Sequence, residues 1–248
     1  AMSKSRGNVV GALDMAEKYG ADTGRLYTLF AAPPEKDLEW SEESIEGAWR
    51  FLNRVYRLVE KHAPALQAVN SRTVDSGDTA GGSETEKALL RKAHQTLRRV
   101  TQDFETRWHF NSAIALIMEL YNDISSGDLE RAVRPRARKE LLELLTLMLA
   151  PMTPHLSEEL WEMLGHSGGL SQVRWPAFNP ELARDEEVEV VVQVNGRVRG
   201  KLKVPAGTPK EELLSRAKQE QFVRQHVNGK RIVKEIVVPD KLVNLVVA

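Results

Sequence analysis

Residues 147–161 read LMLAPMTPHLSEELW, and this stretch decides the fold of the larger part of the chain. The segment that leads into it, residues 141–149, is apolar almost all round a helix, which predicts a central helix buried on every side. Thr153 and Pro154 then form a helix start signal, a capping hydroxyl followed by proline at the first helical position. The stretch therefore predicts a buried helix followed closely by another.

Three long amphipathic segments precede this pair of helices. Their apolar residues recur every three or four positions, as on one face of a helix. Five such helices predict an antiparallel helical bundle over residues 41–165. Residues 70–83, NSRTVDSGDTAGGS, have no such period and predict a mobile polar loop. The three segments begin near Ser41, a capping residue, near Glu84 and near Phe110.

The first forty residues predict a loop followed by two short helices. Asp22 is placed to cap the second helix through its side chain. Gly24 lies inside that helix and should weaken it. The pair Pro33 and Pro34 ends it.

After an irregular linker, residues 166–187, the apolar period changes from 3.6 to 2. This change predicts a small separate α+β domain over residues 188–248. Thr208 and Glu211 form a capping box at the start of its helix. The expected strands cover residues 188–194, 198–204, 232–238 and 242–247.

Asn195 and Gly196 mark the turn of the first hairpin. A three-residue loop with a left-handed Gly196 would pair Val192 with Val198 and leave a clean apolar face. The opposite face would then carry a row of cations about 6.6 Å apart, close to the phosphate spacing of a nucleic-acid strand. A solvated outer face, partly neutralised by Glu189, is the alternative. The row consists of Arg197, Arg199, Lys201 and Lys203.

The composition describes a globular chain with an uneven charge. It has 248 residues, 42% hydrophobic and 28% charged, no cysteine and a formal net charge of zero. Residues 188–248 nevertheless carry twelve Lys and Arg against six Asp and Glu, a balance of +6. The absence of cysteine excludes disulfides and thiolate zinc sites and agrees with a cytoplasmic protein. We therefore expect the C-terminal quarter to bind an anion.

Other candidate sites give weaker signals. The six histidines show no paired ligand spacing, so surface or capping roles are expected, and no metal. Trp49, Trp108 and Trp161 occupy core positions of helices and should pack rather than stack on bases. A basic run at a helix start is either a solvated face or a phosphate contact. That run comprises Arg131, Arg134, Arg136, Arg138 and Lys139.

Several motifs together resemble class I aminoacyl-tRNA synthetases. MSKSRGN at residues 2–8 resembles the KMSKS loop, with Ala1 in place of its first lysine. KYGADTGRLYTLF and the residues after it, to Val59, are similar to the segment that follows this loop in leucyl-tRNA synthetases. LMLAPMTPHLSEELW resembles their anticodon-binding helical domain. VVQVNGRVRGKLKVP (191–205) and VVPDKLVNLVV (237–247) resemble the C-terminal domain of the bacterial leucyl enzymes.

The resemblance implies a multidomain, mainly α architecture and a role for each part. Residues 1–40 would hold the KMSKS loop and connecting helices at the end of a catalytic domain, and residues 41–165 the anticodon-binding bundle. Lys4 would be catalytic, stabilising the pyrophosphate leaving group, in an ATP-binding loop of Met2, Ser3, Lys4 and Ser5. The C-terminal domain would bind tRNA(Leu) through Arg197, Arg199, Lys201, Lys203, Lys230, Arg231 and Lys234.

The resemblance also implies that this chain is a fragment of a leucine–tRNA ligase. ATP with Mg²⁺, and leucine, would bind only in the full-length parent, and the fragment would be inactive alone, monomeric and free of any membrane. Two alternatives remain open. One is a stand-alone RNA-binding or assembly module, and the other is a helical scaffold that binds protein.

Overall fold

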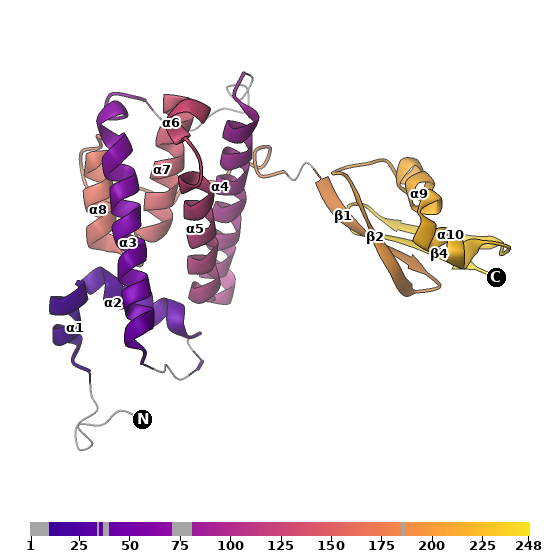
Figure 1. Ribbon diagram of the computed structural model, residues 1–248, viewed down its shortest axis with the longest axis horizontal. Coiled ribbons are helices and arrows are strands. Elements are labelled where there is room, and N and C mark those ends of the chain that lie inside the picture. Colours follow the sequence, from indigo (N-terminus) through magenta and orange to yellow (C-terminus); the bar gives the residue numbers. More distant parts are fainter. Residues whose placement is uncertain (1–9, 34, 37–39, 71–80, 185–186) are drawn as a thin grey trace, which may run out of the picture. The chain divides into compact units, whose positions relative to one another are not determined.

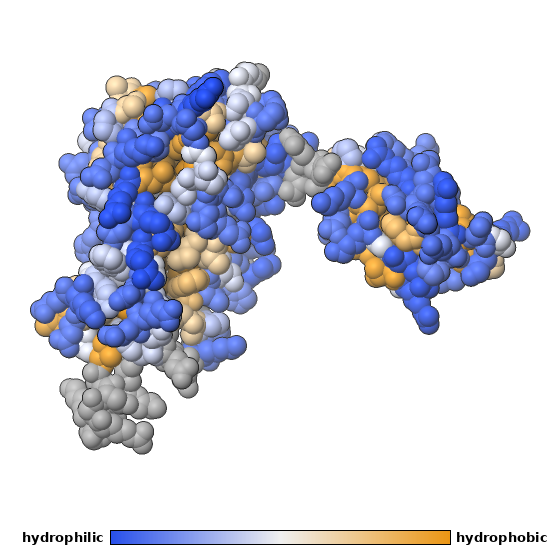
Figure 2. Space-filling view, in the orientation of Figure 1, coloured by the Kyte–Doolittle hydropathy of each residue, from blue (hydrophilic) through white to orange (hydrophobic). Residues whose placement is uncertain are grey.

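A computed structural model describes residues 10–33, 35–36, 40–70, 81–184 and 187–248, with Glu187 described by its backbone alone. The chain divides into two compact units, Ala1–Ala183 and Arg184–Ala248. Each unit has its own cluster of buried apolar side chains. In Figure 2 the visible surface is mostly hydrophilic, and apolar residues reach it in separate patches. The units are therefore described separately.

The first unit is the predicted helical bundle, with two short helices at one end (Figure 1). The connections between the helices contain two turns of 3-10 helix, Ala63–Ala65 and Leu170–Gln172, and a short π-helix, Asp103–Arg107. The α-helices are α1 (Ala12–Tyr19), α2 (Ala21–Ala31), α3 (Glu42–His62), α4 (Glu84–Gln102), α5 (Phe110–Ser125), α6 (Leu129–Ala132), α7 (Pro135–Leu149) and α8 (Pro154–Met163).

Helix α7 is the central helix that the apolar run predicts, and it packs against α4, α5 and α8. It begins at Pro135, earlier than the apolar run, because proline at the first turn is compatible with a helix start. Even charged side chains of its first half are buried. The Lys139 ammonium, for example, donates to the carbonyl oxygen of Val69 at 2.8 Å. Such a bond offsets the cost of burying a charge.

A buried ion pair ties the start of α4 to the start of α7. Glu86 is 1% exposed, and its carboxylate accepts from the Arg134 side chain and, at 2.8 Å, from the Arg134 backbone N–H. Ser83 caps α4 through its hydroxyl, which accepts from the Glu86 N–H at 3.0 Å. Arg134 of the basic run is therefore held by the fold.

The irregular segment after α8 packs on the bundle as far as Ala183, which is fully buried. The Trp175 indole N–H donates to Thr101 Oγ1 at 2.8 Å. His94, buried in α4, accepts from the Asn179 N–H through Nδ1 and lies 3.1 Å from Glu140 Oε1 through Nε2. The segment that the sequence describes as a linker thus belongs to the first unit up to residue 183. These contacts join residues that are far apart in the sequence, so no local sequence pattern predicts them.

The second unit is a four-stranded sheet with two helices on one face (Figure 1). The strand order is β2-β1-β4-β3, in which β1 and β4 are parallel and the outer pairs are antiparallel. All four predicted strands form. A second helix, which no pattern in the sequence predicted, follows the expected one. The elements are β1 (Glu187–Val194), β2 (Arg197–Pro205), α9 (Lys210–Gln219), α10 (Gln221–Val227), β3 (Ile232–Val238) and β4 (Leu242–Val247).

The expected capping box at α9 is absent. The Thr208 hydroxyl donates to the Pro205 carbonyl oxygen at 2.5 Å, and α9 has no side-chain cap. The hydroxyl is therefore used by the turn that leaves β2 and not by the helix N–H groups. At α3, in contrast, the expected cap is confirmed, since Ser41 Oγ accepts from the Ser44 N–H at 3.3 Å.

Candidate nucleic-acid interface

The phosphate-binding loop expected from Met2, Ser3, Lys4 and Ser5 lies outside the described residues. Its role remains a prediction. The described candidates are the cations of the second unit, beginning with the β1–β2 hairpin.

The hairpin turn has two residues, not the three expected. Asn195 and Gly196 both have positive φ, 51° and 76°, and Val194 pairs with Arg197 across the turn. Two consecutive left-handed residues form the type I′ turn that matches the twist of a hairpin. The predicted pairing of Val192 with Val198 is therefore wrong, because asparagine, like glycine, tolerates the left-handed conformation.

A β-bulge at Arg199 restores the apolar face. Gln193 pairs with Val198 and Val192 with Gly200, so Arg199 is an extra residue without a partner on β1. A bulge changes the register by one residue and re-aims the side chains that follow it. Val190 then pairs with Leu202, and both side chains are buried.

The bulge also divides the predicted row of four cations. Lys201 and Lys203 pair with Val191 and Glu189 on the face opposite the buried cluster. The next outward position on β2 after Lys201 belongs to Val198, which is 60% exposed, and not to Arg199 as predicted. The prediction of one continuous row of four cations is therefore wrong.

The two arginines of β2 differ from the lysines. Arg197 is exposed at the turn, opposite the buried Val194. Arg199 is half-buried, and its Nε atom has no hydrogen-bond partner among the described residues. Lys201 is drawn toward Glu189, whose carboxylate lies 2.6 Å from its ammonium. The expected neutralisation by Glu189 is therefore present, but it leaves Lys203 without a described ion pair.

The sheet has one face that no described helix covers. Pairing places Lys234, Ile236 and Val238 of β3 on this open face, opposite Val246, Asn244 and Leu242 of β4. Ile236 and Val238 are 37% and 40% exposed. The open face thus combines exposed apolar side chains on the outer strand β3 with lysines on both outer strands, Lys201 and Lys203 on β2 and Lys234 on β3. Lys230 and Arg231 are exposed in the turn before β3.

The basic run around the start of α7, Arg131 to Lys139, is partly structural. Arg138 and Lys139 are buried, and Arg134 binds Glu86. Arg131 is exposed at the end of α6. Arg134 and Arg136 are exposed as well, so the expectation of a solvated face is wrong for Arg138 and Lys139 alone among the five.

The tryptophan expectation holds for one residue of three. Trp161 is 8% exposed and stacks on His166, with ring centroids 3.7 Å apart. Trp49 and Trp108 are 43% and 61% exposed and so do not fill the core. Helical periodicity predicts which side of a helix a residue is on. It does not show whether another segment covers that side.

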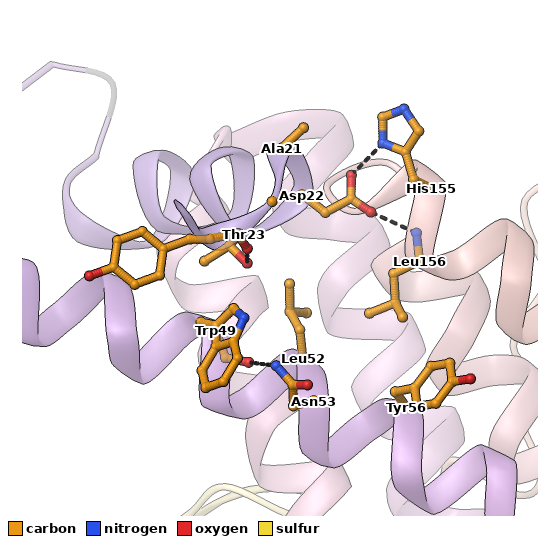
Figure 3. A pocket seen from close by; sticks show the side chains of 11 residues that line it. Ala21, Asp22, Thr23, Trp49, Leu52, Asn53, Tyr56, His155 and Leu156 are labelled. Carbon is orange, nitrogen blue, oxygen red and sulfur yellow. Dashed lines mark hydrogen bonds and ion pairs between the residues drawn. The ribbon is translucent and has the colours of Figure 1, made fainter. Parts of the chain in front are cut away.

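A cavity of about 370 Å³ lies where α2, α3 and α8 meet, and Figure 3 shows its lining. Asp22 reaches from α2 to α8, where its carboxylate accepts from the Leu156 N–H at 2.7 Å and lies 2.9 Å from His155 Nδ1 (Figure 3). The expected cap of α2 by Asp22 is wrong, and so is the cap of α8 by Thr153, whose hydroxyl donates to the Leu149 carbonyl oxygen. Asp22 caps α8 instead.

Two of the histidines are buried rather than on the surface. Burial, followed by the charges of Lys61 and Arg138, lowers the pKa of His62 below its usual value of 6.5. His94 is fully buried. In the described part of the chain, no group of three or more His, Cys, Asp or Glu side chains is arranged to hold a metal ion. Within the same residues, no helix combines the length and apolar character needed to cross a bilayer.

A helical bundle followed by a small sheet domain with a basic open face suits a protein that binds structured RNA. The family model described as the anticodon-binding domain of tRNA ligase matches residues 86–214. This match covers more than half of the chain, so the chain belongs to the tRNA ligase anticodon-binding family. The match begins in α4 and ends in α9, and it therefore includes part of each unit.

Among curated proteins, the chain is similar to leucine–tRNA ligases. It is 50% identical over 246 residues to that of Solibacter usitatus, covering 99% of this chain and 28% of the relative. It is 47% identical over 249 residues to that of Geotalea daltonii, covering 99% and 29%. The chain thus spans less than a third of these relatives, and the match corresponds to the C-terminal part of a class I leucyl-tRNA synthetase. The resemblance read from the sequence is confirmed.

Solved structures agree. The chain is similar to the agnB2 LeuRS of Agrobacterium radiobacter K84, whose structure is a ternary complex with tRNA and LeuAMS. The match covers 100% of this chain and 31% of that protein, with a TM-score of 0.87 and 30% identity. Apo methionyl-tRNA synthetase of Mycobacterium tuberculosis matches 69% of this chain and 40% of its own, with a TM-score of 0.51 and 21% identity. The second likeness shows a shared fold alone.

Proposed function

We propose that this chain is the tRNA-binding part of a leucine–tRNA ligase, which joins leucine to tRNA(Leu) with ATP and Mg²⁺. The observation that carries the tRNA site is the open face of the second unit, where Lys201, Lys203 and Lys234 lie on the two outer strands of the sheet. Lysines that converge on one surface bind phosphates as point charges. Lys230, Arg231, Arg197 and Arg199 lie at or near its ends and extend the basic surface. The protein acts as a monomer in the cytoplasm.

The chemistry of the ligase belongs to the whole enzyme. In the loop of Met2, Ser3, Lys4 and Ser5, the Lys4 ammonium would stabilise the charge that develops on pyrophosphate as leucine attacks the ATP α-phosphate. A single cation lowers that barrier only if other groups hold the adenylate beside it. The chain spans less than a third of its relatives, so we expect no activation of leucine by this chain alone. Leucine-dependent exchange between ATP and pyrophosphate would contradict this expectation.

The tRNA site is tested by titrating leucine tRNA and a non-cognate tRNA at several salt concentrations, with fluorescence anisotropy as the readout. We expect tighter binding of leucine tRNA and a steep fall in affinity with salt. The double variant Lys201→Glu, Lys203→Glu should reduce the slope of log affinity against log salt by about two, one for each lost phosphate contact.

The matched control reverses the same number of charges on the helix-covered side, with Lys210→Glu and Arg224→Glu. Both residues are exposed, on α9 and α10 respectively. This control should leave the salt slope close to that of the unmodified chain. Equal slopes for the two double variants would reject the open face as the tRNA site.

A further inference from the structure

The tripeptide Val-Asn-Gly occurs twice in the second unit, each time followed by a basic residue. The first copy is residues 194–196, before Arg197, and the second is residues 227–229, before Lys230. An asparagine before a glycine is chemically labile, because the glycine backbone nitrogen can attack the side-chain amide carbon and no Cβ hinders its approach. Since the local sequences are alike, a difference in reactivity between the two copies must come from the fold.

The fold holds both reactive groups of the first copy. The Asn195 side chain donates to the Val247 carbonyl oxygen at 3.2 Å and accepts from the Val247 N–H at 2.8 Å. The nitrogen that would attack, the backbone N–H of Gly196, donates to Asn244 Oδ1 at 3.2 Å. Ring closure at Asn195 therefore requires these hydrogen bonds of the folded sheet to open first.

The second copy lies in the exposed turn between α10 and β3. Within the described part of the chain, neither the Asn228 side chain nor the Gly229 N–H makes a hydrogen bond. The backbone forms a type II turn, with φ and ψ of −59° and 126° at Asn228 and a φ of 77° at Gly229. The Lys230 N–H closes this turn by donating to the Val227 carbonyl oxygen at 3.0 Å. Rotation about the Asn228 Cα–C bond, which brings the glycine nitrogen to the side-chain amide, thus opens little more than the turn itself.

We propose that Asn228 is a site of spontaneous deamidation in the folded protein and that the fold protects Asn195 from the same reaction. The Gly229 nitrogen gives up its proton and forms a bond to Asn228 Cγ, while the Cγ–Nδ2 bond breaks and ammonia leaves. Water then opens the resulting succinimide at one of its two C–N bonds. Opening at Cγ gives aspartate, and opening at the backbone carbonyl carbon gives isoaspartate. Either product places a carboxylate where the neutral amide was.

The new carboxylate would lie beside cations of the basic surface. Lys230 and Arg231 are exposed and follow Asn228 directly after the turn. A negative charge among them lowers the positive potential that attracts phosphates. The reaction itself is independent of the proposed function, whereas this consequence for tRNA rests on it.

The test incubates the full chain at mildly alkaline pH, either folded or in concentrated urea, and follows both copies by mass spectrometry of tryptic peptides. Trypsin releases the two copies on different peptides, because lysine or arginine flanks each of them. In the folded chain we expect Asn228 to convert at least about ten-fold faster than Asn195, whose hydrogen bonds must open first. In urea the two rates should agree within about twofold, since little structure distinguishes the copies there. A ratio near one in the folded chain would overturn the proposal.

Two variants test the cause of the difference. Asn244→Ala removes the acceptor of the Gly196 N–H, so conversion at Asn195 should become about three-fold faster or more while that at Asn228 stays the same. Unchanged conversion at Asn195 would show that this hydrogen bond gives no protection. Asn228→Gln is the matched control, because its longer side chain would have to close a less favoured six-membered ring. The acidic species that ion exchange separates from the incubated chain should therefore disappear in this variant.

Leucine tRNA is titrated with Asn228→Asp, which carries the charge of the product, and with Asn228→Gln, which does not. We expect Asn228→Asp to bind about three- to ten-fold more weakly, with a salt slope smaller by up to about one. If the peptides convert as expected but the two variants bind equally, the deamidation site stands and Lys230 and Arg231 are rejected as tRNA contacts. If the folded chain converts both copies equally, the deamidation site is rejected, and tRNA binding through Lys201 and Lys203 is unaffected.

Discussion

The carboxylate of Asp22 connects two helices that lie more than a hundred residues apart in the chain. It accepts from the Leu156 N–H at the start of α8 and lies 2.9 Å from His155 Nδ1, while Asp22 itself is 8% exposed. The first N–H groups of a helix have no partner within the helix, and a buried acceptor there also interacts well with the helix dipole. Asp22 thus links α2 to the start of α8, together with Arg25, which donates to the carbonyl oxygens of Pro151 and Met152.

Replacing Asp22 by alanine should lower the free energy of unfolding by about 1 to 3 kcal/mol, because the Leu156 N–H loses its acceptor. Urea unfolding followed by circular dichroism measures the change. Asp14→Ala is the matched control, since Asp14 is exposed in the first turn of α1, and it should change stability by less than about 0.5 kcal/mol. Equal losses for the two variants would show that the link between α2 and α8 is unimportant.

His62 should make the first unit sensitive to pH. Burial and then the charges of Lys61 and Arg138 lower its pKa, and these effects outweigh the opposing ones of Glu130 and Asp128. The unfolded chain therefore takes up a proton near the usual value of about 6.5, at a pH where the folded chain does not. The stability that neutral His62 contributes is present above that pH and is lost as the pH falls below it.

The measurement compares unfolding free energies at about pH 7.5 and about pH 5.5, values on either side of the usual histidine pKa. His62→Gln has no titrating ring and should lose less stability on acidification than the unmodified chain. His226→Gln, in the second unit, serves as the control and should lose as much as the unmodified chain. A drop in His62→Gln as large as that of the unmodified chain would contradict the prediction.

At the scale of elements, the β1–β2 hairpin shows how a turn is held by the rest of its sheet. The Asn195 side chain donates to the Val247 carbonyl oxygen at 3.2 Å and accepts from the Val247 N–H at 2.8 Å. Asn195 therefore supplies both a tolerated left-handed backbone and a clip to β4. With this clip in place the two-residue turn is retained, and the bulge at Arg199 absorbs the mismatch in register.

Two substitutions separate these roles. Asn195→Gly keeps the left-handed backbone and loses the clip, which should cost about 1 to 2 kcal/mol for two hydrogen bonds. Asn195→Ala loses the clip and adds backbone strain of about 1 kcal/mol or more. Thermal unfolding of both variants should therefore rank alanine below glycine. The reverse order would show that the backbone conformation at the turn is unimportant.

The whole molecule consists of two units with separate buried clusters. We expect calorimetry to show two unfolding transitions, because separate cores can unfold separately. Gly200→Ala should lower the transition of the second unit, since a Cβ there would lie 2.5 Å from the Phe222 ring. Such overpacking costs about 1 to 3 kcal/mol, at about 4 to 8 °C per kcal/mol in a domain of this size.

Gly47→Ala is the control in the first unit. Gly47 lies inside α3 with open space around the position of a Cβ, so alanine should raise the stability of the bundle by about 0.5 to 1 kcal/mol. The two variants should move different transitions in opposite directions. A single transition that responds to both would mean that the two units unfold together.

The long helices of the bundle, the four strands and the family could be predicted from the sequence, because periodicity and motifs are properties of neighbouring residues. Which groups these elements bring together became clear only from the folded chain. Asp22 caps α8 instead of its own helix, Arg199 forms a bulge, and residues 166–183 pack on α4 and the bundle. Trp108 is exposed although its spacing fits a core position. Each of these outcomes depends on the hydrogen-bonding groups and surfaces that segments distant in the sequence bring close. Local sequence patterns do not contain this information.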